Sequence, residues 1–145
     1  MYTEIVDNTQ AKNLPLVYTI EIGQPEDEFY KFYIGKSSKG HNRPLKKYPK
    51  NVSNFESNIY RKSYKNGEII GKRPAWRKHI HPVLSKAKRM SWAIKLTLDP
   101  VDSIYELDVF EQLKLNIMIK KYGIDKTLNI QLVNETNHAK SNGKR

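Results

Sequence analysis

Three segments of the chain alternate apolar with polar residues in the way that predicts β-strands. They span residues 16–22, 29–34 and 91–98, and they are rich in aromatic and β-branched residues. A turn-rich, acidic loop at residues 23–28 joins the first two segments, which favours an antiparallel hairpin. A further short segment, residues 127–132, indicates a final strand or an extended piece of chain.

Three other segments carry helical signals. Residues 53–64 begin with a serine that is followed three residues later by a glutamate, the spacing of a capping box. Residues 74–88 begin at a proline, and we expect an interruption or kink near their second proline. The longest helix is expected over residues 101–122 and ends at Gly123, a residue typical of the position after a helix C-terminus.

Together these elements predict an α+β fold in which a small three-stranded antiparallel sheet is flanked by helices. A length of 145 residues fits a single domain. We expect an N-terminal arm over residues 1–15 and a folded domain over residues 16–132. Residues 133–145 are polar and lack aromatic side chains, so we expect a disordered tail.

The charge balance points to an anionic partner. Lys and Arg number 26 against 15 Asp and Glu, a net charge of +11, which favours DNA or RNA over an acidic membrane surface; the alternative is a charge that serves only solubility. The chain has no cysteine, which excludes disulfides, thiolate zinc sites and cysteine nucleophiles. We expect no membrane partner and a cytoplasmic protein, or a nuclear one in a eukaryotic host, because no long apolar segment or signal peptide is evident.

One carboxylate interrupts an apolar line on the predicted long helix. At 100° per residue, one stripe of this helix consists of Leu107, Glu111, Leu115, Met118 and Tyr122. A buried carboxylate needs a cation, hydrogen-bond donors or water. The sequence leaves two interpretations of Glu111: it lies at the exposed end of the stripe beside a lysine, or it serves a site that binds phosphate through a divalent ion.

Two strand tyrosines form the second candidate feature. Tyr18 lies in the first strand, and Tyr33 lies at the end of the second; tyrosines in strands are most often packing residues. The chain then runs through a glycine, a lysine and a serine at residues 35–37, a strand end that can hold phosphate. Arg43 follows and can offer bidentate hydrogen bonds to the same phosphate.

These residues resemble the signature of the GIY-YIG nuclease family. Leu16-Val17-Tyr18 stands in the place of the first signature tripeptide, and Tyr33-Ile34-Gly35 stands in the place of the second. Arg43 has the spacing at which the family's arginine usually occurs. The third strand, the long helix with its glutamate and Leu128-Asn129 then follow in the family's order, so the resemblance covers residues 16–132.

The resemblance implies a role for each matched residue. Tyr18 would be the general base toward an attacking water, and Tyr33 would line the scissile phosphate. Arg43 would bind the phosphate, and Glu111 would hold one Mg²⁺ or Mn²⁺ ion. Asn129 would support the site from the last segment. Because a tyrosine has a pKa near 10, it needs cations close by to act as a base.

Basic residues around these positions extend the candidate nucleic-acid surface. The basic stretch that begins at Lys72 is either a contact to the phosphate backbone or a solvated helix face. His41 is either a proton-transfer assistant or a solvated loop histidine. The candidate nucleic-acid contacts are Lys36, Ser37, Lys39, His41, Lys46, Lys47, Arg73, Trp76, Arg77 and Lys78.

The sequence therefore predicts a metal-dependent DNA endonuclease, in which a homodimer would make two cuts. An alternative is an inactive module that binds nucleic acid or protein on the same scaffold. This alternative is supported by the position of the glutamate. Many family members carry it at the position that Leu115 occupies here, whereas Glu111 lies one helical turn earlier. A third option, a ribosomal type of RNA-binding protein, fits the charge but does not explain the ordered tyrosines, arginine and asparagine.

Overall fold

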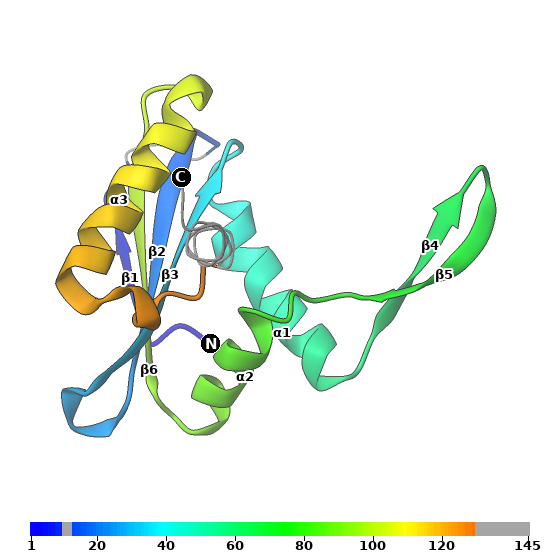
Figure 1. The fold of residues 1–145 in the computed structure, drawn as a ribbon, viewed down its shortest axis with the longest axis horizontal. Coiled ribbons are helices and arrows are strands. Elements are labelled where there is room, and N and C mark those ends of the chain that lie inside the picture. The colour runs from blue at the N-terminus through cyan, green and yellow to red at the C-terminus, as the bar shows by residue number, and fades with distance from the viewer. Residues whose placement is uncertain (10–12, 130–145) are drawn as a thin grey trace, which may run out of the picture.

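The fold is that of a computed structural model that describes residues 1–9 and 13–129. A four-stranded mixed sheet forms its centre (Figure 1), in the order β1-β6-β2-β3. The strands are β1 (Glu4–Asp7), β2 (Leu16–Gly23), β3 (Phe29–Ser37) and β6 (Ala93–Pro100). Strand β2 pairs antiparallel with both β3 and β6, whereas β1 pairs parallel with β6.

The α+β class is confirmed, but the prediction of a three-stranded antiparallel sheet is wrong. The three predicted strands are present, and β1 adds a fourth, parallel strand from residues that we expected in an N-terminal arm. This strand is short and lies at the edge of the sheet, with polar residues at both its ends, so it lacks the alternation that reveals a half-buried strand. The N-terminal segment is therefore part of the folded sheet.

Helices cover both faces of the sheet (Figure 1). Helices α1 (Tyr48–Glu56) and α2 (His81–Arg89) pack on one face, and α3 (Leu107–Tyr122) packs on the other. Successive side chains of β2 pack alternately against these two helical layers. Tyr18 and Ile20 point toward α1 and α2, whereas Val17 points toward α3. Short helical turns are η1 (Pro25–Asp27), η2 (Arg43–Lys47), η3 (Ile104–Glu106) and η4 (Ile124–Lys126).

The region after α1 differs from the prediction. The predicted helix over 53–64 is wrong, since α1 occupies the preceding residues and ends at Glu56. Prolines stand in the first turns of η2 and α1, where they are compatible with a helix. Strands β4 (Tyr60–Lys65) and β5 (Glu68–Pro74) follow as a separate hairpin that projects from the body (Figure 1).

The remaining expectations concern α2, α3 and the C-terminal segment. Helix α2 begins at His81 rather than at residue 74, because the preceding residues belong to β5 and a turn. Helix α3 begins at Leu107 and ends before Gly123, whose positive φ of 102° confirms its predicted role. Thr127 forms an isolated bridge with β3, whereas the rest of the predicted last strand, 130–132, and the predicted tail lie outside the described residues. No described helix has the length and hydropathy needed to cross a membrane.

Candidate functional site

The centre of the candidate site is a glycine that makes room for a tyrosine ring. Tyr18 on β2 pairs with Gly35 on β3, and its ring lies directly over that glycine. A Cβ atom at Gly35 would meet the Tyr18 Cζ atom at 2.2 Å, so no other residue fits without a shift. Tyr18 is only 1% exposed, which places this ring in the core between the sheet and α1.

A second phenol completes the arrangement. The hydroxyl groups of Tyr18 and Tyr48 lie 2.8 Å apart, and the Tyr48 ring lies 6.3 Å from that of Tyr33. Burial raises the pKa of Tyr18 to about 12, while the hydrogen bond from Tyr48 and the charge of Arg43 act in the opposite direction. Burial, Tyr18 and Tyr33 raise the pKa of Tyr48. The two phenols therefore share one buried hydrogen bond, in which either hydroxyl can be the donor.

Arg43 lies beyond the end of the edge strand β3, on the side of α1 and α2. It begins the turn η2, whose next residue, Pro44, accepts a hydrogen bond from the Tyr2 hydroxyl. Its charge acts on Tyr18 and also on Glu111. No described carboxylate lies within ion-pair distance of Arg43, so its guanidinium is available for an anion.

Arg43 opens into a cavity of about 280 Å³, which we name the site pocket. Its lining residues are Arg43, Lys47, Tyr48, Asn51, Arg77 and His81. Three of these residues are cations, none is acidic, and Tyr48 connects the pocket to Tyr18 behind it. The pocket is therefore suited to an anion of the size of a phosphate group.

His81 adds a neutral donor to this pocket. The backbone N–H of Arg77 donates to His81 Nδ1 at 2.8 Å, which places the proton of the neutral ring on Nε2. His81 Nε2 is buried and has no hydrogen-bond partner among the described residues. Burial, together with the charges of His79, Arg77 and Arg43, lowers the pKa of His81 to about 4, so the ring is neutral at pH 7. A buried N–H without a partner is costly, and an anion in the pocket would satisfy it.

Glu111 lies at the border of the core on α3. Leu115 packs in the core beneath α3, whereas Glu111, one turn earlier, is half-buried and lies among the charges of Lys36 and Arg43. Burial and Asp108 raise the pKa of the Glu111 carboxyl, and the two cations lower it. Glu111 is also the weakest of the named influences on the pKa of Tyr18, which it raises, and the helix α3 that carries it packs on the face of the sheet opposite to Tyr18.

The divalent ion that the resemblance implies can be tested against these residues. No group of three or more potential metal ligands of the His, Cys, Asp and Glu types occurs in the described part of the chain. Mg²⁺, however, is commonly held by one or two carboxylates together with substrate phosphates and waters. Glu111 is a single half-buried carboxylate, and Asp108, one turn before it, is exposed and paired with Lys36, so the described residues offer at most one free carboxylate to an ion that a substrate would also have to hold.

Asn129 lies against the strand that carries Tyr33 and Gly35. Its side-chain Nδ2 donates to the Ile34 carbonyl at 2.7 Å, and its Oδ1 accepts from the Ile34 N–H at 2.9 Å. Thr127 holds the amide in place through Oγ1, which donates to the same Oδ1 at 3.0 Å. Asn129 therefore acts as a substitute strand partner for the free edge of β3, and it positions the backbone beside Gly35.

Of the other loop residues that we predicted as nucleic-acid contacts, some are paired within the protein and some have exposed side chains. Lys36 pairs with Asp108, and Ser37 donates to the Gly40 carbonyl at 2.7 Å, so the serine closes its own turn. His41 lies 3.0 Å from Asp7 and contacts Thr9, which ties the loop to the N-terminal strand. The predicted lysines of this surface with exposed side chains are Lys39, Lys46, Lys47 and Lys78.

The basic stretch around Trp76 forms the base of the projecting hairpin rather than a helix face. The Trp76 ring meets Phe55 of α1 and Tyr60 of β4 edge to face, with ring centroids 5.5 and 5.2 Å away. Arg73 ends β5, and Arg77 lies between the hairpin and α2. The tryptophan therefore attaches the hairpin to the body, and both arginines remain exposed beside it.

The sequence reasoning missed Tyr48, Asn51 and His81. Tyr48 lies five residues after Arg43, a step that does not place two residues on one face of an α-helix, and Asn51 lies one turn further along α1. His81 is remote in the sequence, and no local pattern indicates that it reaches the pocket. Comparisons of the chain with protein-family models, with curated proteins and with solved structures gave no match.

Proposed function

We propose that the chain is a metal-dependent DNA endonuclease of the GIY-YIG type. The observation that carries this proposal is the site pocket, an acid-free cavity in which Arg43, Lys47 and Arg77 surround a donor-rich space. Tyr48 lines this cavity and its hydroxyl lies 2.8 Å from that of Tyr18, while Glu111 is contributed by α3 and is not among the lining residues. A phosphodiester in this pocket meets cations, a neutral N–H donor and a proton acceptor at once.

The roles of the residues follow from these positions. Arg43 and His81 Nε2 hold the non-bridging oxygens and stabilise the charge that develops on phosphorus. The oxygen of a water attacks phosphorus, the phosphorus–oxygen bond to the leaving sugar breaks, and the proton of the water passes to the ionised form of the pair, in which one of the two phenols has already lost its proton. Glu111 would hold the divalent ion, which as a Lewis acid stabilises the leaving oxygen when it is bound.

The alternative of an inactive binding module retains one specific support. The Tyr18 pKa of about 12 leaves little phenolate near neutral pH, and Tyr48 separates Tyr18 from the pocket. In this case the same cations would bind a nucleic-acid backbone without cutting it. The two functions differ in one measurable property, the cleavage of a bound strand.

Plasmid nicking distinguishes them. Under the nuclease proposal, the purified chain converts supercoiled plasmid to the open circle in Mg²⁺ or Mn²⁺, but not in a chelator. Tyr18→Phe abolishes the conversion while salt-sensitive DNA binding remains. Binding without any nicking in either ion would establish the inactive module instead.

A further inference from the structure

The hairpin of β4 and β5 projects from the body and contributes almost nothing to its packing. Ser63 and Pro74 are its only partly buried residues, and its strands pair with each other rather than with the main sheet. A two-stranded ribbon of this kind is only marginally stable on its own. An exposed ribbon that buries so little surface is more readily explained by a partner that it contacts.

The base of the hairpin is fixed to the body. The Trp76 ring packs between Phe55 and Tyr60, and the Ala75 N–H donates to the Ile59 carbonyl at 3.0 Å. Asn54 also donates to the Ala75 carbonyl at 3.4 Å. The ribbon therefore leaves the body in a defined direction.

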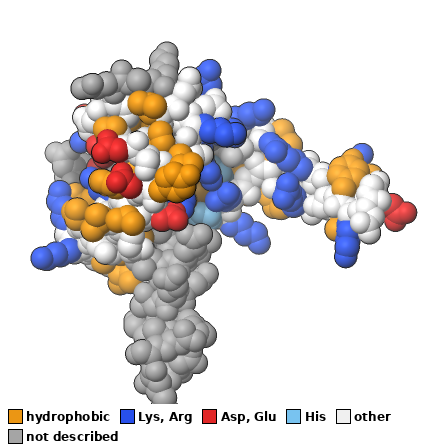
Figure 2. Space-filling model, turned by 90° about the horizontal axis from the view of Figure 1, so that it is seen from above, with side chains coloured by type: hydrophobic (Ala, Val, Ile, Leu, Met, Phe, Trp, Pro, Cys, Tyr) orange, Lys and Arg blue, Asp and Glu red, His pale blue; other side chains and the backbone are white. Residues whose placement is uncertain are grey.

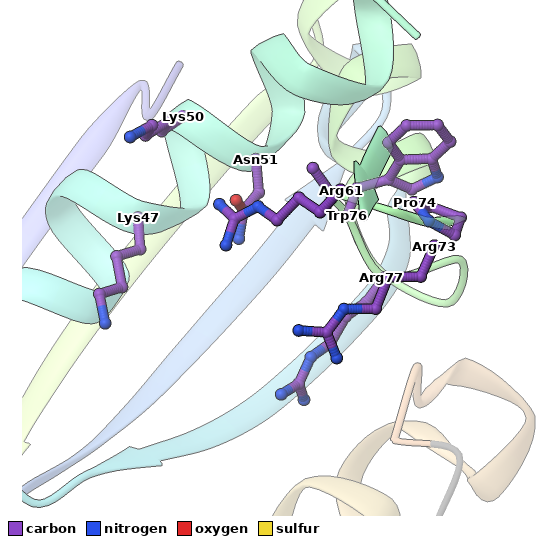
Figure 3. A pocket seen from close by; sticks show the side chains of 9 residues that line it. Lys47, Lys50, Asn51, Arg61, Arg73, Pro74, Trp76 and Arg77 are labelled. Atoms are coloured by element: carbon purple, nitrogen blue, oxygen red, sulfur yellow. The ribbon is translucent and has the colours of Figure 1, made fainter. Parts of the chain in front are cut away.

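A second basic cavity of about 430 Å³ opens at this base (Figure 3), and we name it the hairpin pocket. Its lining residues are Lys47, Lys50, Asn51, Arg61, Arg73, Pro74, Ala75, Trp76 and Arg77. It shares Lys47, Asn51 and Arg77 with the site pocket, so the two cavities are adjacent, and we refer to them together as the channel. The lining of this channel contains no carboxylate.

The register of the hairpin places like charges opposite each other. Arg61 pairs directly with Arg73, and Lys62 pairs with Lys72 on the other face of the ribbon. Like charges directly opposite destabilise a ribbon, and no described carboxylate forms an ion pair with any of these four residues. Only the arginine pair lines the hairpin pocket, where its guanidinium groups share an open space with Arg77 (Figure 3).

We propose that the hairpin is a duplex-DNA clamp, in which Arg61 and Arg73 bind backbone phosphates next to the phosphodiester in the site pocket. This inference rests on the proposed function for the identity of the strand in that pocket. Figure 2 shows Lys and Arg side chains gathered along the junction of body and hairpin, so the positive surface is continuous there. The hairpin deepens the proposed function by assigning duplex DNA as the substrate and a phosphate-binding role to the arginine pair.

The dimensions of the ribbon favour duplex DNA over duplex RNA. Strand β4 has six residues and is about 20 Å long, which corresponds to about six base-pair steps. The major groove of B-DNA is about 12 Å wide and admits a two-stranded ribbon. The major groove of A-form RNA is deep and narrow, and it excludes such a ribbon.

The two cation pairs of the hairpin provide a matched test. Arg61→Gln with Arg73→Gln removes two charges from the channel face, and Lys62→Gln with Lys72→Gln removes two charges from the opposite face. Binding of a duplex of about 20 base pairs is measured by fluorescence anisotropy in a chelator, from about 50 to about 200 mM salt, so that cleavage plays no part. Melting temperatures of both variants confirm that the body remains folded.

We expect the arginine variant to lower the salt slope by about 1.8, because each lost phosphate contact removes about 0.9. At 0.1 M salt this change corresponds to an affinity loss of about 60-fold, if affinities are equal at 1 M. The lysine variant should lose less than half of that slope. An RNA duplex of the same sequence should bind more weakly, with little difference between the two variants.

Three results would overturn the inference. Equal losses in both variants would mean that only net charge matters, and no loss in the arginine variant would assign the hairpin to another partner, such as a protein. RNA binding that depends equally on the arginine pair would contradict the groove argument. Plasmid nicking is measured separately. A selective loss of binding in the arginine variant without any nicking by the wild type would contradict the nuclease proposal alone. Nicking by the wild type together with equal binding losses in the two variants would contradict the clamp proposal alone.

Discussion

Replacing Gly35 by alanine tests the packing on which the site is built. The new Cβ atom would lie 2.2 Å from Tyr18 Cζ and 2.4 Å from its hydroxyl oxygen, whereas an ordinary contact is at least 3.4 Å. The tyrosine ring must therefore move by about 1.2 Å, away from β3 and against Tyr48, whose ring meets it edge to face at 5.6 Å. A change of this kind costs about 1–3 kcal/mol of the free energy of unfolding.

Gly23→Ala is the matched control for this substitution. Gly23 ends β2, and its added Cβ atom would find its nearest neighbours at 3.7 and 3.8 Å, which are ordinary contacts. In thermal unfolding followed by circular dichroism, Gly35→Ala should melt about 4–12 °C below wild type, and Gly23→Ala should melt close to it. Nicking should fall only in Gly35→Ala, because the phenol pair is displaced. Equal melting temperatures and equal nicking in the two variants would refute the packing argument.

Three further predictions concern the donors around the site. The depressed His81 pKa means that stability is lost as the pH falls from 6.5 toward 4, by about 3 kcal/mol, and urea unfolding should show a smaller loss in His81→Gln. Asn129→Ala leaves both Ile34 backbone groups unpaired and should cost about 1–3 kcal/mol in the same assay. Tyr48→Phe removes the hydrogen bond that lowers the pKa of Tyr18, so the pH profile of nicking should move to higher pH.

The sequence predicted the central strands well and the peripheral elements poorly. Strand β6 is visible because the alternation of its residues matches its burial, whereas β2 and β3 are visible as short apolar runs rich in aromatic and β-branched residues that are buried on both faces. The capping-box spacing of Ser53 and Glu56 misled the helix prediction. It falls in the last turn of α1, where the Glu56 carboxylate accepts from Ser85 and pairs with Lys88 instead of capping a helix.

The β4–β5 hairpin was predictable only at its turn. Asn66 and Gly67 both have positive φ, the signature of a tight two-residue hairpin turn, and their dipeptide marks a turn in the sequence. The flanking strands are exposed and basic, so no alternation of apolar residues reveals them. An exposed ribbon lacks the pattern that core packing imposes.

The candidate site also contains some residues that local motifs predict and others that only tertiary packing brings in. The positions of Tyr18, Gly35 and Arg43 follow from local motifs, because a strand pair and a short loop bring them close together. Tyr48 and His81 reach the pocket through the packing of α1 and α2, which no local spacing encodes. Glu111 was visible as a carboxylate on an apolar stripe, but only the packing of Leu115 against the sheet shows which way its turn faces.

The central claim is that Glu111 and the phenol pair form one hydrolytic site. The most direct test compares Mn²⁺-dependent plasmid nicking by wild type, Glu111→Gln and Glu106→Gln, since Glu106 is an exposed acid just before the same helix. We predict that Glu111→Gln abolishes nicking and binds DNA at least as tightly as wild type, because it removes a negative charge beside the phosphate, while Glu106→Gln cuts normally. Normal nicking by Glu111→Gln would contradict the account.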